Sequence, residues 1–287
     1  MKLVTYRGKH EARRAARAGV LVENGVIDVS RLVGPLPTDV LGLIQGGPSM
    51  LDRVREAAAR ASATPLADVT LLAPIQRPPK IVCIGVNYAD HAAEAGRAVP
   101  PLPSVAFMKA PSCIIGPGEA IVRPPTTEQL DYEVELAVVI GRQTKAVSKE
   151  DALSYVAGYT IMNDASARDL QMSRDVGIIL GKNFDTSAPL GPAITLTDEI
   201  PDPSHLGIRT WINGELRQDG NTKNLIFDVP AIIAYVSQQL TLEPGDLIAT
   251  GTPAGVGLGM SPQVWLQPGD TVRMEVDGIG VLENPVT

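Results

Sequence analysis

The sequence predicts a β-rich α+β fold in which strands outnumber helices. Three Asn-Gly or Asp-Gly pairs lie between alternating apolar residues, in 22–27, 211–216 and 275–280. Such pairs are the strongest short-range indication of a tight β-hairpin. Two Pro-Gly-Asp turns, in 244–251 and 268–276, each lead into a strand-like run, so the last two thirds of the chain is predicted to be mainly β.

Few helices are predicted, and local patterns indicate three of them most directly. Residues 38–62 are rich in helix formers but are broken at "GGP". Residues 148–158 open with a Ser148/Asp151 capping pattern, which predicts a helix there. A third helix is expected from about 228 to 240, because Ile232, Ile233, Val236 and Leu240 form an apolar stripe at helical spacing.

The Pro-rich segment 73–80, "APIQRPPK", is the best candidate for a domain boundary. It predicts a small N-terminal α+β domain over residues 1–75 and a larger, catalytic domain over residues 76–287. With 287 residues, of which 44% are hydrophobic, the chain can supply the cores of both units.

Composition and charge indicate which kinds of molecule the protein binds and where it is located. The formal net charge of −7 argues against a nucleic-acid-binding surface, so small molecules are the expected partners. The first ten residues lack the apolar region of a signal peptide, and no apolar run approaches the roughly 18 residues of a membrane span, which predicts a cytoplasmic protein without membrane contact. Cys83 and Cys113 lie in apolar surroundings and are predicted to be buried free thiols.

The segment 131–141, "DYEVELAVVIG", places three acids on one face of a predicted strand. Glu133 and Glu135 are close enough to converge on one cation, which would remove the penalty of burying like charges. The alternative is an edge strand whose acidic face meets solvent. Asp131 belongs to the same row.

A third acid follows in 159–175, "YTIMNDASARDLQMSRD". If a helix begins at Asp164, then Asp164, Arg168 and Gln171 share one of its faces. A solvated helix face capped by an aspartate is the alternative. Lys182 is expected in the glycine-rich loop of 180–192, either as an anion contact or as a surface lysine.

His91 and Glu94 lie three residues apart in "NYADHAAEAG", so that a helical turn would let the carboxylate orient the imidazole as a general base. An incidental helix pair is the alternative. The glycine-rich "GTPAGVGLGM", 251–260, lacks the GK[ST] of a phosphate loop and the helix of a dinucleotide-binding fold.

Taken together, these segments resemble the fumarylacetoacetate hydrolase family over about residues 78–282. The matching blocks occur in the family's order and include "CIGVNYADHAAEAG", "FMKAPS", "DYEVELAVVIG", "GKNFDTSAPLGP" and "PGDLIATGTPAGVG". The resemblance implies a mixed β-roll or β-sandwich-like fold, a homodimer, and a bound Mg²⁺ or Mn²⁺, for which Ca²⁺ can substitute in crystals. The family's metal ligands fall on Glu133, Glu135 and Asp164, and Asp131 is left with a structural role.

The same resemblance implies the remaining roles. His91 and Glu94 become the catalytic dyad on a lid segment, Lys182 joins them, and the substrate contacts are Arg168, Gln171 and Thr252. Ser187 stands where Phe is common in the family, and this difference is expected to widen or polarise the pocket floor. The expected activity is metal-dependent hydrolysis of a C–C bond in an acylpyruvate or another 1,3-diketo acid. The alternatives are decarboxylation of an oxaloacetate-like 2-oxo acid, or an isomerase or lyase reaction.

Overall fold

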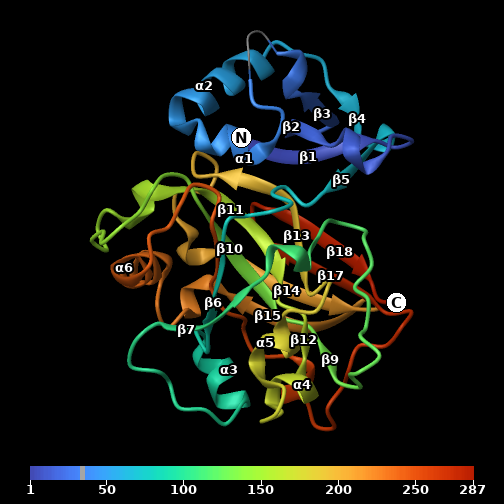
Figure 1. Cartoon of the computed structure of the whole chain (residues 1–287), viewed down its shortest axis with the longest axis vertical. Coiled ribbons are helices and arrows are strands. Elements are labelled where there is room, and N and C mark those ends of the chain that lie inside the picture. Colours follow the sequence, from blue (N-terminus) through green and yellow to red (C-terminus); the bar gives the residue numbers. More distant parts are fainter. Residues whose placement is uncertain (33–35) are drawn as a thin grey trace.

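The computed structural model describes residues 1–32 and 36–287, and it confirms the β-rich α+β class (Figure 1). The strands are β1 (Lys2–Gly8), β2 (Arg17–Val22), β3 (Gly25–Asp28), β4 (Thr64–Pro65), β5 (Val69–Leu72), β6 (Ile81–Gly85), β7 (Ser104–Lys109), β8 (Ile114–Ile115), β9 (Leu130–Asp131), β10 (Val134–Ile140), β11 (Val156–Asn163), β12 (Ser166–Ala167), β13 (Ala188–Leu196), β14 (Gly207–Ile212), β15 (Glu215–Asn221), β16 (Leu247–Ala249), β17 (Thr271–Val276) and β18 (Gly280–Pro285). The helices are α1 (Val40–Gln45), α2 (Gly47–Ala58), α3 (Ala89–Glu94), α4 (Arg168–Met172), α5 (Gly177–Lys182) and α6 (Val229–Gln239).

One long sheet runs through the molecule in the order β4-β3-β2-β1-β13-β11-β10-β16-β6-β7. Neighbouring strands in this order are antiparallel except β16 and β6, which are parallel. A second sheet, β15-β14-β17-β18, packs against the central strands of the first. A short pair, β12-β9, forms where the chain enters β10 and leaves β11. This sheet-on-sheet arrangement agrees with the sandwich-like fold that the resemblance implied.

Strand β10 is buried on both of its faces, because it lies in the middle of the long sheet between two cores. Val134, Leu136 and Val138 contribute to the core shared with the second sheet and with α6. Ala137 and Val139 face the opposite core, which includes residues of the N-terminal region. A strand buried in this way reads as a nearly continuous apolar run, which is what residues 136–140 show.

All three predicted hairpins are confirmed. Val22 pairs with Gly25, Ile212 pairs with Glu215, and Val276 pairs with Gly280 across their turns. At the second turn, Asn213 and Gly214 have φ values of 52° and 84°, the left-handed conformation that a two-residue hairpin turn of this type requires.

Two of the three helix predictions are confirmed. Residues 38–62 contain α1 and α2 with a break at Gly46, and α6 follows Asp228, whose carboxylate caps the helix by accepting from the Ala231 N–H at 2.9 Å. The prediction over 148–158 is wrong. Ser148 does bond to Asp151, but only a 3-10 turn follows, because the chain is drawn into β11 from Val156 onward, where it pairs with β10.

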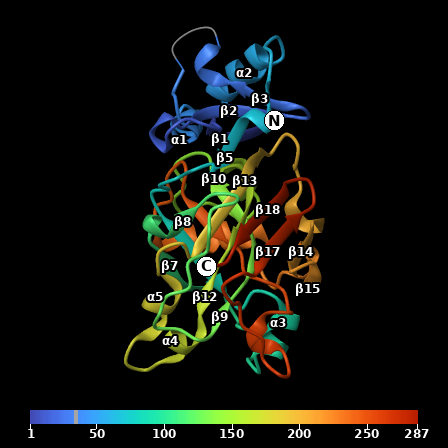
Figure 2. The same cartoon turned by 90° about the vertical axis from the view of Figure 1, so that its right-hand side faces the viewer.

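The N-terminal region lies at one end of the molecule, and α3, α4 and α5 lie toward the other (Figures 1 and 2). It is not separated from the rest by a loose linker, since Lys2 and Leu3 of β1 pair with Thr195 and Ile194 of β13. The N-terminal amine also forms ion pairs with Asp198 and Glu199. The division of the chain into two domains near residue 75 therefore stays a prediction.

Both cysteines are buried and free, as expected. Within the described ranges, no helix combines the length and the apolar character that crossing a bilayer requires.

Candidate metal and substrate site

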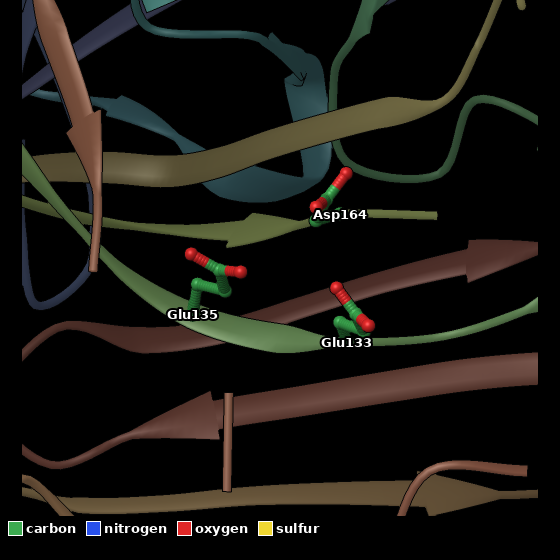
Figure 3. Close-up of side chains that lie close together, drawn as sticks. All are labelled: Glu133, Glu135 and Asp164. Atoms are coloured by element: carbon green, nitrogen blue, oxygen red, sulfur yellow. The ribbon is translucent and has the colours of Figure 1, made fainter. Parts of the chain in front are cut away.

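Three buried carboxylates meet at the end of the β10–β11 pair (Figure 3). Glu135 lies on β10, Glu133 immediately precedes this strand, and Asp164 immediately follows β11. Because β10 and β11 are antiparallel and Val134 pairs with Asn163, the backbones of Glu133 and Asp164 lie side by side, and the Asp164 N–H donates to the Glu133 carbonyl at 2.9 Å. One oxygen from each carboxylate lies within 4.8 Å of the others.

The three acids of 131–135 do not lie on one continuous strand, as their alternation suggested. The strand is interrupted at Tyr132 and Glu133, where the Asp131 carboxylate accepts from the Tyr132 N–H at 2.9 Å and Asn163 Oδ1 accepts from the Glu133 N–H at 3.1 Å. The edge-strand alternative is wrong, because β10 is flanked by β11 and β16 and all three acids of the row are buried.

The helix expected to begin at Asp164 begins four residues later. Ser166 and Ala167 form β12 and pair with β9, so helix α4 starts only at Arg168. Asp164 is therefore presented by the end of a strand. Arg168 and Gln171 do share the helix, and Arg168 Nη1 donates to Gln171 Oε1 at 3.1 Å.

Three buried cations surround the acids. Lys182 Nζ lies 2.7 Å from both Glu133 Oε2 and Asp164 Oδ2, and Lys109 Nζ lies 2.6 Å from Asp164 Oδ1. Arg168 lies between two acids, with Nη2 2.6 Å from Glu133 Oε1 and Nε 2.8 Å from Asp131 Oδ2. Lys182 ends helix α5 and is almost fully buried. The predictions that it lies in a loop and that it could be a surface lysine are therefore both wrong.

Lys109 was not predicted from the sequence as a site residue. It ends strand β7, within the "FMKAPS" block, and its ammonium also donates to the Lys182 carbonyl oxygen. A lysine at the end of a strand is usually exposed, so its residue type carried no signal. Only its place inside a block of the family resemblance pointed to it.

The two neighbouring glutamates have opposite electrostatic surroundings. Burial alone would raise the pKa of Glu133, but Arg168, Lys182 and His91 outweigh burial and hold this pKa well below its ordinary value. Burial, together with the charges of Asp164 and Glu133, raises the pKa of Glu135 well above its ordinary value. Among the described residues, no cationic nitrogen lies within ion-pair distance of Glu135.

This donor set fits a hard divalent cation. Three carboxylates offer the oxygen ligands that Mg²⁺ and Mn²⁺ prefer, and they leave other coordination positions for water or substrate. Glu135 Oε2 accepts from the Gly251 N–H at 2.7 Å, and no hydrogen bond in the described structure reaches its other oxygen. A cation beside Glu135 would supply the positive charge that this carboxylate lacks.

The acids open into a cavity of about 330 Å³, within the range typical of small-molecule sites. Apolar side chains also line it, and Ile84, Phe107, Met172 and Leu258 are among them. The predicted site residues that line it are His91, Glu133, Glu135, Asp164, Arg168, Gln171, Lys182 and Thr252. Thr252 Oγ1 accepts from Gln218 Nε2 at 2.7 Å.

The His91 and Glu94 side chains come from helix α3, as the spacing indicated. His91 Nδ1 lies 3.3 Å from Glu94 Oε2, and only His91 reaches the cavity. Glu94 lies behind the imidazole and accepts from the Gly255 N–H through Oε1 at 2.9 Å.

Ser187 has a different place from the expected one. It does not line the cavity, and its Oγ donates to the Lys182 carbonyl oxygen at 2.9 Å. Ser187 therefore supports the end of helix α5 behind the cavity and neither widens nor polarises its floor.

A model of the C-terminal domain of fumarylacetoacetate (FAA) hydrolase matches residues 80–287. The chain is 43% identical to the mitochondrial oxaloacetate tautomerase FAHD2A of Homo sapiens over 290 residues, which cover 100% of this chain and 91% of the relative. It is 42% identical to the mitochondrial oxaloacetate tautomerase Fahd2a of Rattus norvegicus, with the same coverage.

Solved structures agree. The chain is similar to the fumarylacetoacetate hydrolase of Exiguobacterium antarcticum, with a TM-score of 0.85 and 41% identity over 100% of this chain and 99% of that one. It is also similar to a maleylpyruvate hydrolase from Sphingobium sp. SYK-6 in complex with manganese(II) and pyruvate, with a TM-score of 0.82 and 31% identity at the same coverage.

The prediction of a cytoplasmic protein is contradicted by these comparisons, since the curated relatives of Rattus norvegicus, Bos taurus and Homo sapiens are named as mitochondrial. The prediction rested on the lack of a signal peptide, and a signal peptide is only one of several kinds of targeting segment.

Proposed function

The chain belongs to the fumarylacetoacetate hydrolase family, and from this premise we propose that it catalyses the keto-enol tautomerisation of oxaloacetate or a closely related 2-oxo diacid with a divalent cation. Members of this family include hydrolases, isomerases and tautomerases. The observation that carries the proposal is the cavity itself, in which a buried carboxylate triad faces a histidine held by a glutamate.

Glu133, Glu135 and Asp164 would hold Mg²⁺ or Mn²⁺. When bound, the cation supplies a positive charge that favours the enolate form of a 2-oxo acid over its neutral forms. Lys182 and Lys109 hold the carboxylates of Glu133 and Asp164 in place through their short ion pairs.

His91 is the group that moves the proton in this proposal. Glu94 lies against Nδ1, so the other ring nitrogen, Nε2, is left to exchange a proton with the substrate. Tautomerisation removes one proton from the carbon next to the keto group and places one on the oxygen, and the same imidazole can take the first and return the second. No water is consumed in this reaction.

Arg168, Gln171 and Thr252 are the proposed substrate contacts. The Gln171 amide oxygen accepts from Arg168, which leaves its NH₂ group free to donate to a substrate oxygen. The guanidinium of Arg168 is already held by Asp131 and Glu133, so it contributes a fixed positive charge at the cavity wall.

Hydrolysis of an acylpyruvate C–C bond, which the sequence favoured, becomes the second candidate. The observation in its favour is the likeness to a maleylpyruvate hydrolase over the whole chain. In that reaction His91 would deprotonate a water molecule, which attacks the distal carbonyl. The tautomerases rank first because two of them are 43% and 42% identical to this chain, whereas the maleylpyruvate hydrolase is 31% identical. The fumarylacetoacetate hydrolase of Exiguobacterium antarcticum is 41% identical, so hydrolysis is kept as the second candidate.

One set of assays separates the candidates. The purified protein is stripped of metal with a chelator, reloaded with Mg²⁺ or Mn²⁺, and given enol-oxaloacetate, maleylpyruvate and simple acylpyruvates, with matched metal-only blanks. We expect metal-dependent ketonisation of oxaloacetate above the blank, with little C–C cleavage, and a loss of ~10²- to 10⁴-fold in His91→Ala. Faster cleavage of an acylpyruvate than ketonisation would favour the hydrolase, and release of CO₂ the decarboxylase.

A further inference from the structure

The glycine-rich segment 251–260, which matches no phosphate-binding motif, runs past the helix that carries His91. The Gly255 N–H donates to Glu94 Oε1 at 2.9 Å, while Glu94 Oε2 faces His91 Nδ1 at 3.3 Å. The two oxygens of one carboxylate therefore join the loop to the imidazole.

Gly259 lies directly against the Glu94 side chain. A Cβ atom at Gly259 would lie 2.0 Å from Glu94 Cδ, 2.2 Å from Cγ and 2.3 Å from Oε1, and these are its three nearest contacts. The backbone of Gly259 lies outside the left-handed region, so an alanine could adopt it. The lack of a side chain at this position thus serves to make room for Glu94.

Gly255 is required for a different reason. Its φ is 104°, and a Cβ would lie 2.0 Å from the Arg217 carbonyl oxygen. Only glycine adopts this conformation readily, and it is this conformation that directs the Gly255 N–H at Glu94.

The buried Asp131 carboxylate anchors the same loop to the floor of the site. It accepts from the Gly257 N–H at 2.7 Å and from the Leu258 N–H at 3.1 Å, and it pairs with Arg168 Nε at 2.8 Å. The loop position is therefore tied to the guanidinium that also contacts Glu133.

We propose that residues 255–259 form a seat for Glu94, and that Gly259 is a positioning residue that sets the orientation of His91 through Glu94. The proposal rests on the proposed function in that His91 exchanges the proton. The carboxylate is held by a backbone N–H on one side and by an open glycine surface on the other, which restricts its rotamers to those that reach the imidazole.

The test is Gly259→Ala, with Gly8→Ala as the matched control. Gly8 also has an ordinary backbone, and a Cβ there would press on the side chain of a glutamate, Glu11, far from the site. We expect Gly259→Ala to lower kcat by about 10- to 100-fold with little change in KM, as for other residues that orient a catalytic group, and Gly8→Ala to leave both unchanged.

A double-mutant cycle identifies the route of the effect. If Gly259 acts only through Glu94, then adding Gly259→Ala to Glu94→Ala causes no further loss of kcat. Losses that multiply in the double variant would overturn the seat. So would a Gly259→Ala enzyme with wild-type kcat when Glu94→Ala is impaired.

A measurement without substrate or metal keeps this test separate from the proposed function. Hydrogen exchange of residues 88–97 in the metal-free protein should speed up in Gly259→Ala and in Glu94→Ala but not in Gly8→Ala. A wild-type kcat in Glu94→Ala would remove the dyad from the mechanism, and this exchange would then decide the seat alone.

The melting temperatures of the single and double variants serve as the control for an effect on stability. If Gly259→Ala lowers the melting temperature, the Gly259→Ala/Glu94→Ala variant should recover it, because the new methyl group then has room. Failure to recover would locate the clash elsewhere and contradict the seat.

Discussion

Glu133 and Glu135 belong to the same site but differ in the charged groups that contact their carboxylates. Glu133 contacts both Arg168 and Lys182, whereas Glu135 has only the Gly251 N–H and faces two other acids. Removing the charge of Glu133 leaves two buried cations short of a partner, and removing that of Glu135 leaves none. Identical residue types two positions apart should therefore respond differently to the same substitution.

We expect Glu133→Gln to destabilise the metal-free protein by about 3–5 kcal/mol, the usual cost of breaking a buried ion pair from one side. Glu135→Gln should leave the stability equal or higher, because it removes a repelling charge. Urea unfolding in the presence of a chelator measures both. Both variants should lose the stabilisation that added Mg²⁺ or Mn²⁺ gives the wild-type protein. Equal destabilisation of the two metal-free variants would contradict this account.

At the scale of elements, residues 88–104, the segment predicted to act as a lid, consist of a buried start, the short helix α3 and an exposed tail. Tyr88 is fully buried, whereas Gly96, Arg97, Ala98 and Val99 are exposed. Helix α3 is only six residues long, too short to be stable alone, so its position depends on packing and on the contact of Glu94 with the 255–259 loop. Such a segment can order further around a bound substrate.

Trypsin can report this ordering, because Arg97 lies in the exposed tail and also lines the cavity. We expect oxalate, an enolate mimic, to slow cleavage after Arg97 in the presence of Mg²⁺. Arg60 is an exposed residue just after helix α2 and serves as the internal control, since cleavage there should not change. Equal rates at Arg97 with and without oxalate would show that the segment does not close.

At the scale of the whole molecule, the outer strand of the long sheet carries an apolar surface. Strand β7 ends the sheet order, and helix α5 packs beside it. The exposed apolar side chains on these elements and on the segments next to them are Val99, Leu102, Val105, Met108, Met172, Val176, Ile179 and Leu180. An open strand edge with such a surface favours association, and we propose that a second copy of the chain covers it.

Light scattering during size-exclusion chromatography tests this homodimer. The wild-type protein should elute with twice the 30.3 kDa chain mass, and Ile179→Arg should shift it toward the monomer. Leu216→Arg is the control, because Leu216 is similarly exposed but lies on β15 of the other sheet. A wild-type monomer, or a dimer unchanged by Ile179→Arg, would contradict this interface.

The sequence by itself determined the features that depend on residues close together in the chain. Asn213 and Gly214 specify their hairpin through backbone preference, Asp228 caps α6, and the spacing of His91 and Glu94 places both on one helix. The three acids predicted as metal ligands do lie together, as the family resemblance and the spacing of two of them indicated, and their binding of a metal stays a proposal.

Only the tertiary structure decided which ion pairs the site's distant groups form, and that Lys109 belongs to the site. Lys109, Arg168 and Lys182 come from three separate segments, and each meets the acids because strand pairing brings those segments together. The pairing of β12 with β9 delays the start of α4 to Arg168. The fold also places Gly259 against Glu94, 165 residues away in the chain. Local patterns carry information about the backbone within a few residues, whereas these contacts depend on the register of strands far apart in sequence.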